Sequence, residues 1–303
     1  MIRALPFLLV VYCGAACASA AQPSPPPTPR FDSARAFADL KKIVDIGPRP
    51  AGSPGAARTR EYITAELKAA GLTVEEQAFE GNTPLGPIKM VNLRAVLPGT
   101  GGTSGRRLII AGHYDTKRYD DITFVGANDG GSSAAFLIEL ARALQGTRHA
   151  LPIELVFFDG EEAVVEWQGT DNTYGSRHYV AQADRDGTLK DIGALILVDM
   201  IGEHDVRLLR DTNSTPWLVD IFWSTARRMN RPEFSSQEMV INDDHLPFLH
   251  AGIPAIDLID LNYPAWHTEG DTMDKVSASS LQAVGDVLLA ALPDVIARVK
   301  IGR

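Results

Sequence analysis

Apolar residues recur along this chain at two spacings, which predict helices and strands in turn. Apolar positions three or four residues apart predict helices over residues 31–44, 56–70, 134–144, 216–229 and 279–299, and another that begins at residue 174. Apolar or alternating runs between turn residues predict strands over residues 73–79, 90–97, 107–111, 153–158, 194–198, 238–241 and 255–259. From residue 107 onward strands and helices alternate, which is typical of an α/β domain with a mostly parallel sheet between layers of helices. The chain shows no internal repeat, and residues 32–303 are expected to form a single domain.

The predicted strand over residues 153–158 leads directly into a short acidic segment. Its apolar residues are followed by Asp159 and Gly160 and then by two adjacent carboxylates, Glu161 and Glu162. Buried strands that stop at a glycine turn and then present acids build sites at the carboxyl edge of open α/β sheets. Two neighbouring glutamates suggest that one binds a metal ion and the other transfers a proton, although alone they would also fit an acidic surface loop.

Potential metal ligands recur beyond other predicted strands and in the loops that follow them. Together with the acidic segment they make five such residues: His113, Asp129, Glu162, Asp199 and His267. Imidazole and carboxylate donors without thiolates suit zinc in a catalytic site rather than in a structural one. Glu161, which is next to Glu162 but is not one of these five residues, is then placed to act as general base and acid.

The composition is that of an ordinary globular protein. Of the 303 residues, 45% are hydrophobic and 22% are charged, and the formal net charge is -9. The chain has no long basic run, so its charge pattern argues against nucleic acid as a partner.

The first 20 residues have the pattern of a secretory signal peptide. Arg3 supplies a basic start, residues 5–12 form a short apolar run, and residues 18–20 (Ala-Ser-Ala) provide a cleavage site. The apolar run is too short to remain as a transmembrane span, and we expect export to the periplasm or the medium. Residues 21–31 are rich in proline and are predicted to form an extended tether before the catalytic domain.

Both cysteines of the chain, Cys13 and Cys17, lie within the predicted signal peptide. Its removal would leave a chain with no cysteine and therefore no disulfide, even in an oxidising compartment. Cys17 is also a candidate for lipid attachment, but residues 14–16 (Gly-Ala-Ala) lack the aliphatic residue that usually precedes a lipidated cysteine. Lipid anchoring is therefore the less favoured alternative.

Several motifs, taken together, resemble the M28 family of zinc aminopeptidases over almost the whole mature chain. The segments that carry the resemblance are Ile46–Arg49, Ala111–Thr116, Gly126–Asp129, Phe158–Glu162 and Trp266–Thr268. The resemblance implies a three-layer αβα sandwich with a central mixed, mostly parallel twisted sheet, of the zinc aminopeptidase type.

Finer features resemble the animal-type glutaminyl cyclases within that family. They are the acidic segment followed by Trp167 and Asp171, the segments Tyr174–His178 and Asp243–Leu249, and Trp266 directly before His267. The loop Thr268–Val276 resembles the aminopeptidase version instead, and the paired cysteines of animal secreted members are absent. This combination fits a bacterial relative of the animal cyclases.

The resemblance implies a role for each candidate residue. A single zinc ion would bind to Asp129, Glu162 and His267, and Glu161 would transfer the proton. Asp199 and Asp243 would form a hydrogen-bonded acid pair, and His113 would support the ligands or bind a second metal ion. The substrate pocket would be lined by Trp167, Trp266 and Tyr263. Three carboxylates so close together are expected to keep at least one protonated near neutral pH, as a hydrogen-bond donor.

The activity that the resemblance implies is that of a glutaminyl-peptide cyclotransferase acting on peptides and proteins with an N-terminal glutamine. The α-amino group attacks the side-chain amide carbon of the same residue, closes a five-membered lactam and releases ammonia. Zinc would polarise the γ-carbonyl, and Glu161 would carry the proton from the amine to the leaving nitrogen. We expect the enzyme to be a monomer.

Two other functions stay open on the sequence alone. A two-zinc aminopeptidase would use all five ligands, with Glu161 activating a bridging water. An inactive peptide-binding module is less favoured, because such modules normally lose a ligand or the base, and none is missing here. His245 also has two open roles, since it could hold Asp243 in place or cap the following helix.

Overall fold

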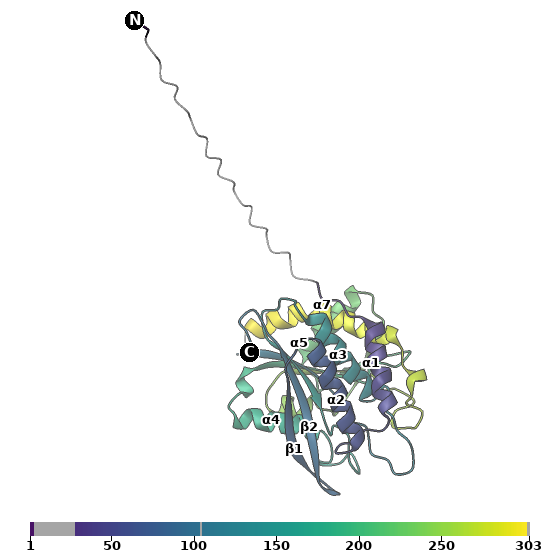
Figure 1. Cartoon of the computed structure of the whole chain (residues 1–303). Helices are drawn as coiled ribbons and strands as arrows, with labels where there is room; N and C mark the ends of the chain where they lie inside the picture. The colour runs from purple at the N-terminus through teal and green to yellow at the C-terminus, as the bar shows by residue number, and fades with distance from the viewer. Residues whose placement is uncertain (3–27, 104, 302–303) are drawn as a thin grey trace.

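The computed structural model of the chain describes residues 1–2, 28–103 and 105–301 (Figure 1). The predicted signal peptide, with Cys13 and Cys17, lies outside the described residues apart from its first two positions. The predicted tether over residues 21–31 also lies outside them, apart from residues 28–31. Cleavage, lipid attachment and the nature of the tether therefore stay predictions.

A six-stranded mixed sheet forms the centre of the fold, with the strand order β1-β2-β4-β3-β5-β8. Strands β4, β3, β5 and β8 run parallel, whereas the β1–β2 hairpin joins β4 in antiparallel register. The strands are β1 (Val74–Thr83), β2 (Gly86–Leu97), β3 (Arg107–His113), β4 (Ile153–Phe158), β5 (Ile192–Asp199) and β8 (Ala255–Ile259). This arrangement confirms the predicted mixed, mostly parallel sheet.

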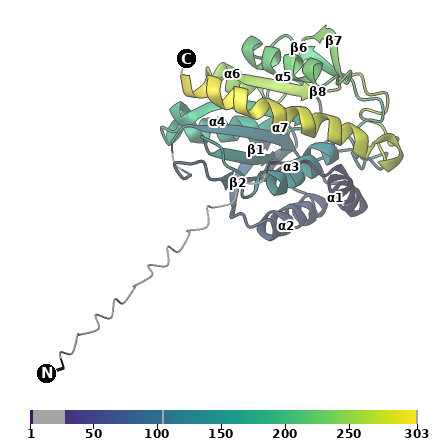
Figure 2. The same ribbon diagram turned by 90° about the horizontal axis from the view of Figure 1, so that it is seen from above.

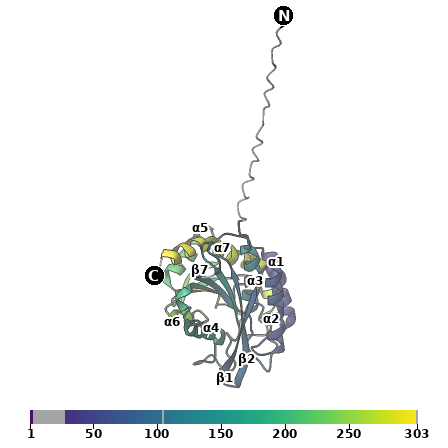
Figure 3. The same cartoon turned by 60° about the vertical axis from the view of Figure 1, so that its left-hand side comes forward.

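Helices cover both faces of the sheet, so the fold has the three layers that the sequence predicts. One face carries α1 (Ser33–Ile46), α2 (Pro54–Ala69), α3 (Gly131–Leu144), α5 (Pro216–Arg228) and α7 (Ala278–Ile301). The other face carries α4 (Tyr174–Arg185) and the short α6 (Leu246–His250). Figure 2 shows α7 lying along the sheet, and Figure 3 shows α4 and α6 on the side away from α1, α2 and α3. The 3-10 turns η1 (Leu189–Asp191) and η2 (Met273–Lys275) complete the elements.

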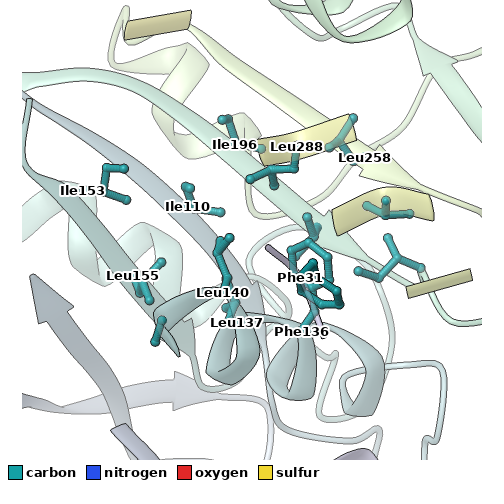
Figure 4. Packing of buried hydrophobic residues seen from close by; sticks show 14 of the residues in the cluster. Phe31, Ile110, Phe136, Leu137, Leu140, Ile153, Leu155, Ile196, Leu258 and Leu288 are labelled. Atoms are coloured by element: carbon teal, nitrogen blue, oxygen red, sulfur yellow. The ribbon is translucent and has the colours of Figure 1, made fainter. Parts of the chain in front are cut away.

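Alternate residues of the central strands supply the two hydrophobic cores. In β3, Leu108 and Ile110 face the larger helix layer, whereas Ile109 packs with the layer that contains α4 and α6. Parallel strands that are buried on both faces need apolar side chains at nearly every position, which explains the unbroken apolar runs in the sequence. On the larger side, Phe31 stacks on Phe136 with ring centroids 4.7 Å apart (Figure 4).

The structure differs from the sequence prediction mainly in a small second sheet. Its parallel strands are β6 (Leu208–Asp211), which was not predicted, and β7 (Phe234–Met239), whereas the predicted strand over residues 238–241 begins only as β7 ends. Half of the residues of β7 are exposed and its four central residues are polar, so it lacks the apolar alternation from which strands are predicted. The five-residue helix α6 was likewise too short to leave a helical repeat.

Among the described helices, α7 alone is long and apolar enough to cross a membrane. Of its apolar window, 67% is buried inside the fold, where its side chains belong to the larger hydrophobic core. That burial fits a core helix.

The parallel strands bring their carboxyl ends to one edge of the sheet. His113 at the end of β3 is in register with Phe158 at the end of β4, and Asp199 at the end of β5 is in register with Ile259 of β8. The loops that follow these four strands therefore gather at the same edge, where open α/β sheets place their sites.

Candidate active site

Three of the predicted zinc ligands converge at this edge of the sheet from three different loops. Donor atoms of Asp129, Glu162 and His267 all lie within 4.8 Å of one another. His267 Nε2 is 3.1 Å from Glu162 Oε1 and 3.4 Å from Asp129 Oδ2. Asp129 precedes α3, Glu162 follows β4, and His267 lies between β8 and η2. The structure thus brings together residues that are up to 138 positions apart in the sequence.

The donor atoms of this triad fit a zinc ion. Two carboxylates and one imidazole form a three-ligand set of the kind found in catalytic zinc sites. Asp129 Oδ2 and Glu162 Oε2 are buried and accept no hydrogen bond from the described residues. Buried carboxylate oxygens are costly without a partner, and a divalent cation would supply one for each.

The pKa values of the three residues also fit a zinc site. Burial, followed by the charge of Asp129, raises the pKa of Glu162 to about 7. Burial lowers the pKa of His267, but its hydrogen bonds and charge interactions with the two carboxylates raise it to about 9. The pKa of Asp129 falls below its ordinary range because the close contacts of its carboxylate with His113 and His267 outweigh its burial. Protons held in this way are those that a metal ion displaces when it binds.

The two remaining candidate ligands form a second triad that shares Asp129. His113 Nε2 lies 3.0 Å from Asp199 Oδ1 and 3.3 Å from Asp129 Oδ1, and all three residues are buried. All five residues that the sequence singles out as potential ligands therefore lie in one site. The geometry alone is compatible with one metal ion or with two.

Glu161 lies beside His113 of the second triad and lines the same cavity as the first triad, with its carboxyl group buried. Its Oε2 is 3.9 Å from His113 Nδ1, and only 6% of the residue is exposed. Burial raises the pKa of Glu161 well above its ordinary value, and nearby Asp243 and Glu162 add to this, although His113 opposes it. A carboxyl group whose pKa lies well above the usual range can both accept and return a proton near neutral pH.

Asp115 and a tight turn set the direction of the two adjacent glutamates. Asp115 Oδ1 accepts the backbone N–H of Glu161 at 3.1 Å, and its Oδ2 accepts that of Glu162 at 3.4 Å. Gly160, just before them, has φ +69°, and a Cβ there would lie 2.6 Å from Met90 Sδ. The turn therefore requires glycine, which explains the abrupt end of the apolar run at Asp-Gly.

The predicted hydrogen-bonded pair of Asp199 and Asp243 stays a prediction, although the two acids are close enough for Asp243 to raise the pKa of Asp199. Asp199 Oδ1 accepts the backbone N–H of Met200 at 2.8 Å and faces His113 instead. Asp243 Oδ1 accepts the N–H of Asp244, and the carboxyl group of Asp243 lies beside that of Asp257. Both acids nevertheless line the same cavity, and burial, with Asp243 contributing, raises the pKa of Asp199 to about 6.

His245 occupies the N-cap position of α6, one of the two roles that the sequence left open, but its side chain does not cap the helix. It is fully buried, makes no side-chain cap to α6, and lies between two aspartates. Its Nε2 is 3.0 Å from Asp211 Oδ2, and its Nδ1 is 3.7 Å from Asp257 Oδ2. Burial and then the charge of Asp243 raise the pKa of Asp257 well above its ordinary value. Sequence reasoning missed both aspartates, because each belongs to a strand whose other residues are mostly apolar.

The site opens into a cavity of about 480 Å³. Trp167 and Trp266, both predicted to contact substrate, line it and are 39% and 43% exposed. The ring of Trp266 stacks on that of His267, with centroids 4.3 Å apart. Exposed indole faces above a buried polar floor are suited to hold the apolar part of a ligand.

Tyr263 does not line this cavity, although it was predicted to. Its side chain is buried, and its hydroxyl donates a hydrogen bond to Asp271 Oδ1 at 2.7 Å. The same carboxylate accepts the backbone N–H groups of Asn128 and Asp129. Tyr263 and Asp271 thus support a metal-binding loop, a role that the sequence did not reveal because Asp271 looks like one more loop acid.

A buried arginine supports the same loop from below. Arg49 donates to the carbonyl oxygens of Tyr114 and Gly126 at 2.6 Å each, and to that of Asp129 at 3.2 Å. Its side chain is fully buried, and burial lowers its pKa to about 10 although Asp129 and other nearby carboxylates raise it. The Ile46–Arg49 motif therefore acts on the site through the backbone.

Comparisons with known proteins agree with this site. A model of peptidase family M28 matches residues 92–292. The glutaminyl-peptide cyclotransferase of Drosophila melanogaster is 31% identical over 282 residues, which span 82% of this chain and 79% of that protein. The crystal structure of a glutaminyl cyclase from an Acidobacteriales bacterium is 38% identical, with a TM-score of 0.84 over 93% of this chain and 100% of that chain. A leucine aminopeptidase precursor from Bacteroides thetaiotaomicron is 26% identical, with a TM-score of 0.80 over 89% of this chain and 99% of that chain.

These matches confirm the resemblance that the sequence motifs carry. The family model covers more than half of the chain, and the cyclase relatives are matched over most of their own length. The chain belongs to peptidase family M28, in the branch that contains the glutaminyl-peptide cyclotransferases.

Proposed function

We propose that this protein is a zinc-dependent glutaminyl-peptide cyclotransferase, which converts the N-terminal glutamine of peptides and proteins into pyroglutamate. The observation that carries the proposal is the position of Glu161, a buried acid beside a three-ligand zinc site and below two exposed tryptophans. The relatives named as cyclases support the same activity.

Zinc would be held by Asp129, Glu162 and His267, where it would act as a Lewis acid on the γ-carbonyl of the substrate. The cavity walls have a separate task. Trp167 and Trp266 would hold the glutamine side chain folded back toward its own amine. The entropic cost of that orientation would then be met on binding and not in the ring-closing step.

Glu161 would carry one proton through the reaction. It takes a proton from the α-amine as the nitrogen bonds to the side-chain amide carbon. It then returns that proton to the amide nitrogen, whose bond to the same carbon breaks, and ammonia leaves. The raised pKa of Glu161 suits both steps, because the group must be protonated and deprotonated within one turnover. Asp243 would keep this acid in a negative surrounding that favours its protonated form, and Asp199 would lie with them in the same cavity.

We further propose that one zinc ion binds per chain. His113 Nε2 lies 3.0 Å from Asp199 Oδ1, so that these two residues satisfy each other. The alternative is a two-zinc aminopeptidase, which the second triad and the aminopeptidase neighbour would suit. That alternative has weaker support, since the aminopeptidase is 26% identical and the cyclase structure is 38% identical.

We also propose that the protein is exported as a monomer to the periplasm or the medium after cleavage at Ala20. The support is the signal-peptide pattern of the sequence. N-terminal sequencing of the protein from the periplasmic fraction, with sedimentation of the purified protein, tests both parts.

The activity is tested with two peptides that differ only in the first residue, glutamine or leucine. Purified protein should lower the mass of the glutamine peptide by one ammonia and leave the leucine peptide intact, and a zinc chelator should stop the reaction. Release of free leucine by a protein that contains two zinc ions per chain would overturn the proposal in favour of the aminopeptidase.

A further inference from the structure

His267 of the proposed zinc triad has a strained backbone conformation. Its φ is +57°, in the left-handed region that residues with a Cβ rarely adopt. Among the described residues, only three others that are not glycine have a positive φ. Such a conformation persists only where neighbouring groups hold it, and it concentrates at functional sites. The geometry of the triad therefore depends on the groups that hold this backbone.

Backbone hydrogen bonds within the loop between β8 and η2 supply part of this support. The N–H of Trp266 donates to the carbonyl of Tyr263 at 3.1 Å. The N–H of Thr268 donates to the carbonyl of Ala265, also at 3.1 Å. No backbone N–H of the described residues donates to the carbonyl of His267 itself. The backbone bonds thus fix the residues before and after His267 but leave its own carbonyl to another donor.

Tyr119 supplies that donor from a different loop. Its hydroxyl donates to the carbonyl oxygen of His267 at 3.1 Å, across 148 positions of the sequence. Tyr119 lies between β3 and α3, in the loop that also carries Asp129, so the bond joins two loops that carry zinc ligands. Burial, followed by the charges of Glu162 and Asp129, raises the pKa of Tyr119 to about 12. The hydroxyl therefore stays protonated and able to donate.

Aromatic rings pack around the imidazole of His267. The ring of Phe124 meets it edge-on with centroids 6.0 Å apart, and the ring of Trp266 stacks on it with centroids 4.3 Å apart. Tyr119 in turn packs edge-on against Phe124, which is buried, with centroids 5.7 Å apart. The ring of Tyr119 thus acts through Phe124, whereas its hydroxyl acts on the backbone of His267. Removal of the hydroxyl alone separates the two contributions.

We propose that Tyr119 is a positioning residue, which holds the strained backbone of His267 so that the imidazole faces Asp129 and Glu162. This inference rests on the proposed function, in which these three residues bind zinc. Without the hydroxyl, His267 relaxes toward an ordinary backbone conformation, and its imidazole turns away from the two carboxylates. Zinc then binds more weakly, while Glu161, which lies in another loop, keeps its place.

Tyr119→Phe tests the proposal, because it removes the hydroxyl and keeps the ring. Competition with a zinc chelator should show an affinity about tenfold weaker than that of the wild type, since loss of a group that orients a metal ligand has an effect of this order. Excess zinc should restore the turnover of a glutamine peptide almost to the wild-type rate, because Glu161 is unchanged. Thermal unfolding of the zinc-free variant measures whether the fold is retained.

Tyr62→Phe is the matched control. The hydroxyl of Tyr62 donates to Asp39 Oδ1 at 2.7 Å and so joins α2 to α1, and Tyr62 lies outside the cavity lining. This variant also loses one hydrogen bond of a tyrosine hydroxyl, but it should keep the wild-type zinc affinity.

The outcomes separate the positioning role from the proposed function. If the wild-type protein binds no zinc, the proposed function fails and the positioning role with it. If the wild type binds zinc and Tyr119→Phe binds it equally well, the zinc site stands and the positioning role is overturned. A loss of affinity that Tyr62→Phe shares would assign the effect to the stability of the fold and would also overturn the role. The same holds for a loss of activity in Tyr119→Phe that excess zinc does not restore.

Discussion

The carboxylate of Asp271 holds the backbone of Asp129, because its Oδ2 accepts the Asp129 amide N–H at 3.0 Å. Its Oδ1 accepts the amide N–H of Asn128 at 2.8 Å and the hydroxyl of Tyr263 at 2.7 Å. Asp129 belongs to both possible metal triads, so its position governs any ion that binds. A carboxylate that is itself no ligand therefore fixes the residue that the two triads share.

Replacing Asp271 with alanine should weaken zinc binding. The variant leaves two buried amide groups without an acceptor, and each such group costs about 1 to 3 kcal/mol. Loss of a residue that orients a ligand lowers metal affinity about 10- to 100-fold. Competition with a zinc chelator measures the affinity, and thermal unfolding measures the stability.

The matched control for that variant is Asp274→Ala. Asp274 lies three residues further on, is exposed, and bonds only to the neighbouring Thr272 and Lys275. It should keep the wild-type zinc affinity. Equal affinity of the Asp271 and Asp274 variants would contradict the proposed support of Asp129.

Glu161→Gln should abolish ring closure without removing zinc. The amide keeps the shape of the side chain but cannot carry the proton, and loss of a general acid–base typically lowers the rate about 10²- to 10⁴-fold. Ammonia release measures the rate, and metal analysis of the same sample measures the zinc. Glu61→Gln, on the exposed side of α2, is the control and should be fully active. A variant of Glu161 that loses its zinc as well would instead place this residue among the ligands.

The two histidines of the site should differ in their effect on zinc content. His267→Ala removes a ligand from the proposed zinc triad and should leave the protein without tightly bound zinc. His113→Ala removes a residue from the second triad and should leave one zinc ion per chain. Metal content after dialysis decides between them, with the exposed His250→Ala as control. Two zinc ions in the wild-type protein and one in the His113 variant would support the aminopeptidase alternative.

Asp171 should contribute stability that is lost in acid. Burial raises its pKa, but the hydroxyl of Tyr174 and the backbone N–H groups of Glu166, Val165 and Val164 lower it below the ordinary value of 3.8. A carboxylate with a depressed pKa stabilises the fold fully above the unfolded value and loses that effect as the pH falls through the folded value. The difference in unfolding free energy between wild type and Asp171→Asn should therefore be constant above about pH 5 and shrink below pH 3.8.

Urea unfolding at a series of pH values measures this difference, with the exposed Asp184→Asn as control. The sign is the informative part of the result. A difference that grows as the pH falls would mean that Asp171 is held protonated in the fold, which contradicts its hydrogen bonds to three backbone N–H groups.

The sequence alone was enough to predict the layers of the fold and most of the site. Apolar runs between turn residues, such as residues 155–158, are typical of strands buried on both faces, which require helices on either side. Parallel strands end at one edge of the sheet, so ligands placed after different strands had to meet there. That rule brings the five candidate ligands and Glu161 together, because strand order does not change which ends of the strands come together. The choice of Asp129, Glu162 and His267 as the zinc triad came from the resemblance to the glutaminyl cyclases.

Only the tertiary structure decided which polar residues serve the site and which support it. Tyr263 was expected at the substrate, but packing turned its hydroxyl inward to Asp271. His245 was expected to cap a helix or hold Asp243, and it is the N-cap residue of α6, yet its side chain lies between Asp211 and Asp257. A hydrogen bond forms only when donor and acceptor are placed to within a few tenths of an ångström and point toward each other. Neighbours from distant parts of the chain set that placement. Residue type and spacing therefore identified the chemistry. The contacts that orient the metal-binding and catalytic side chains form only when the loops pack together.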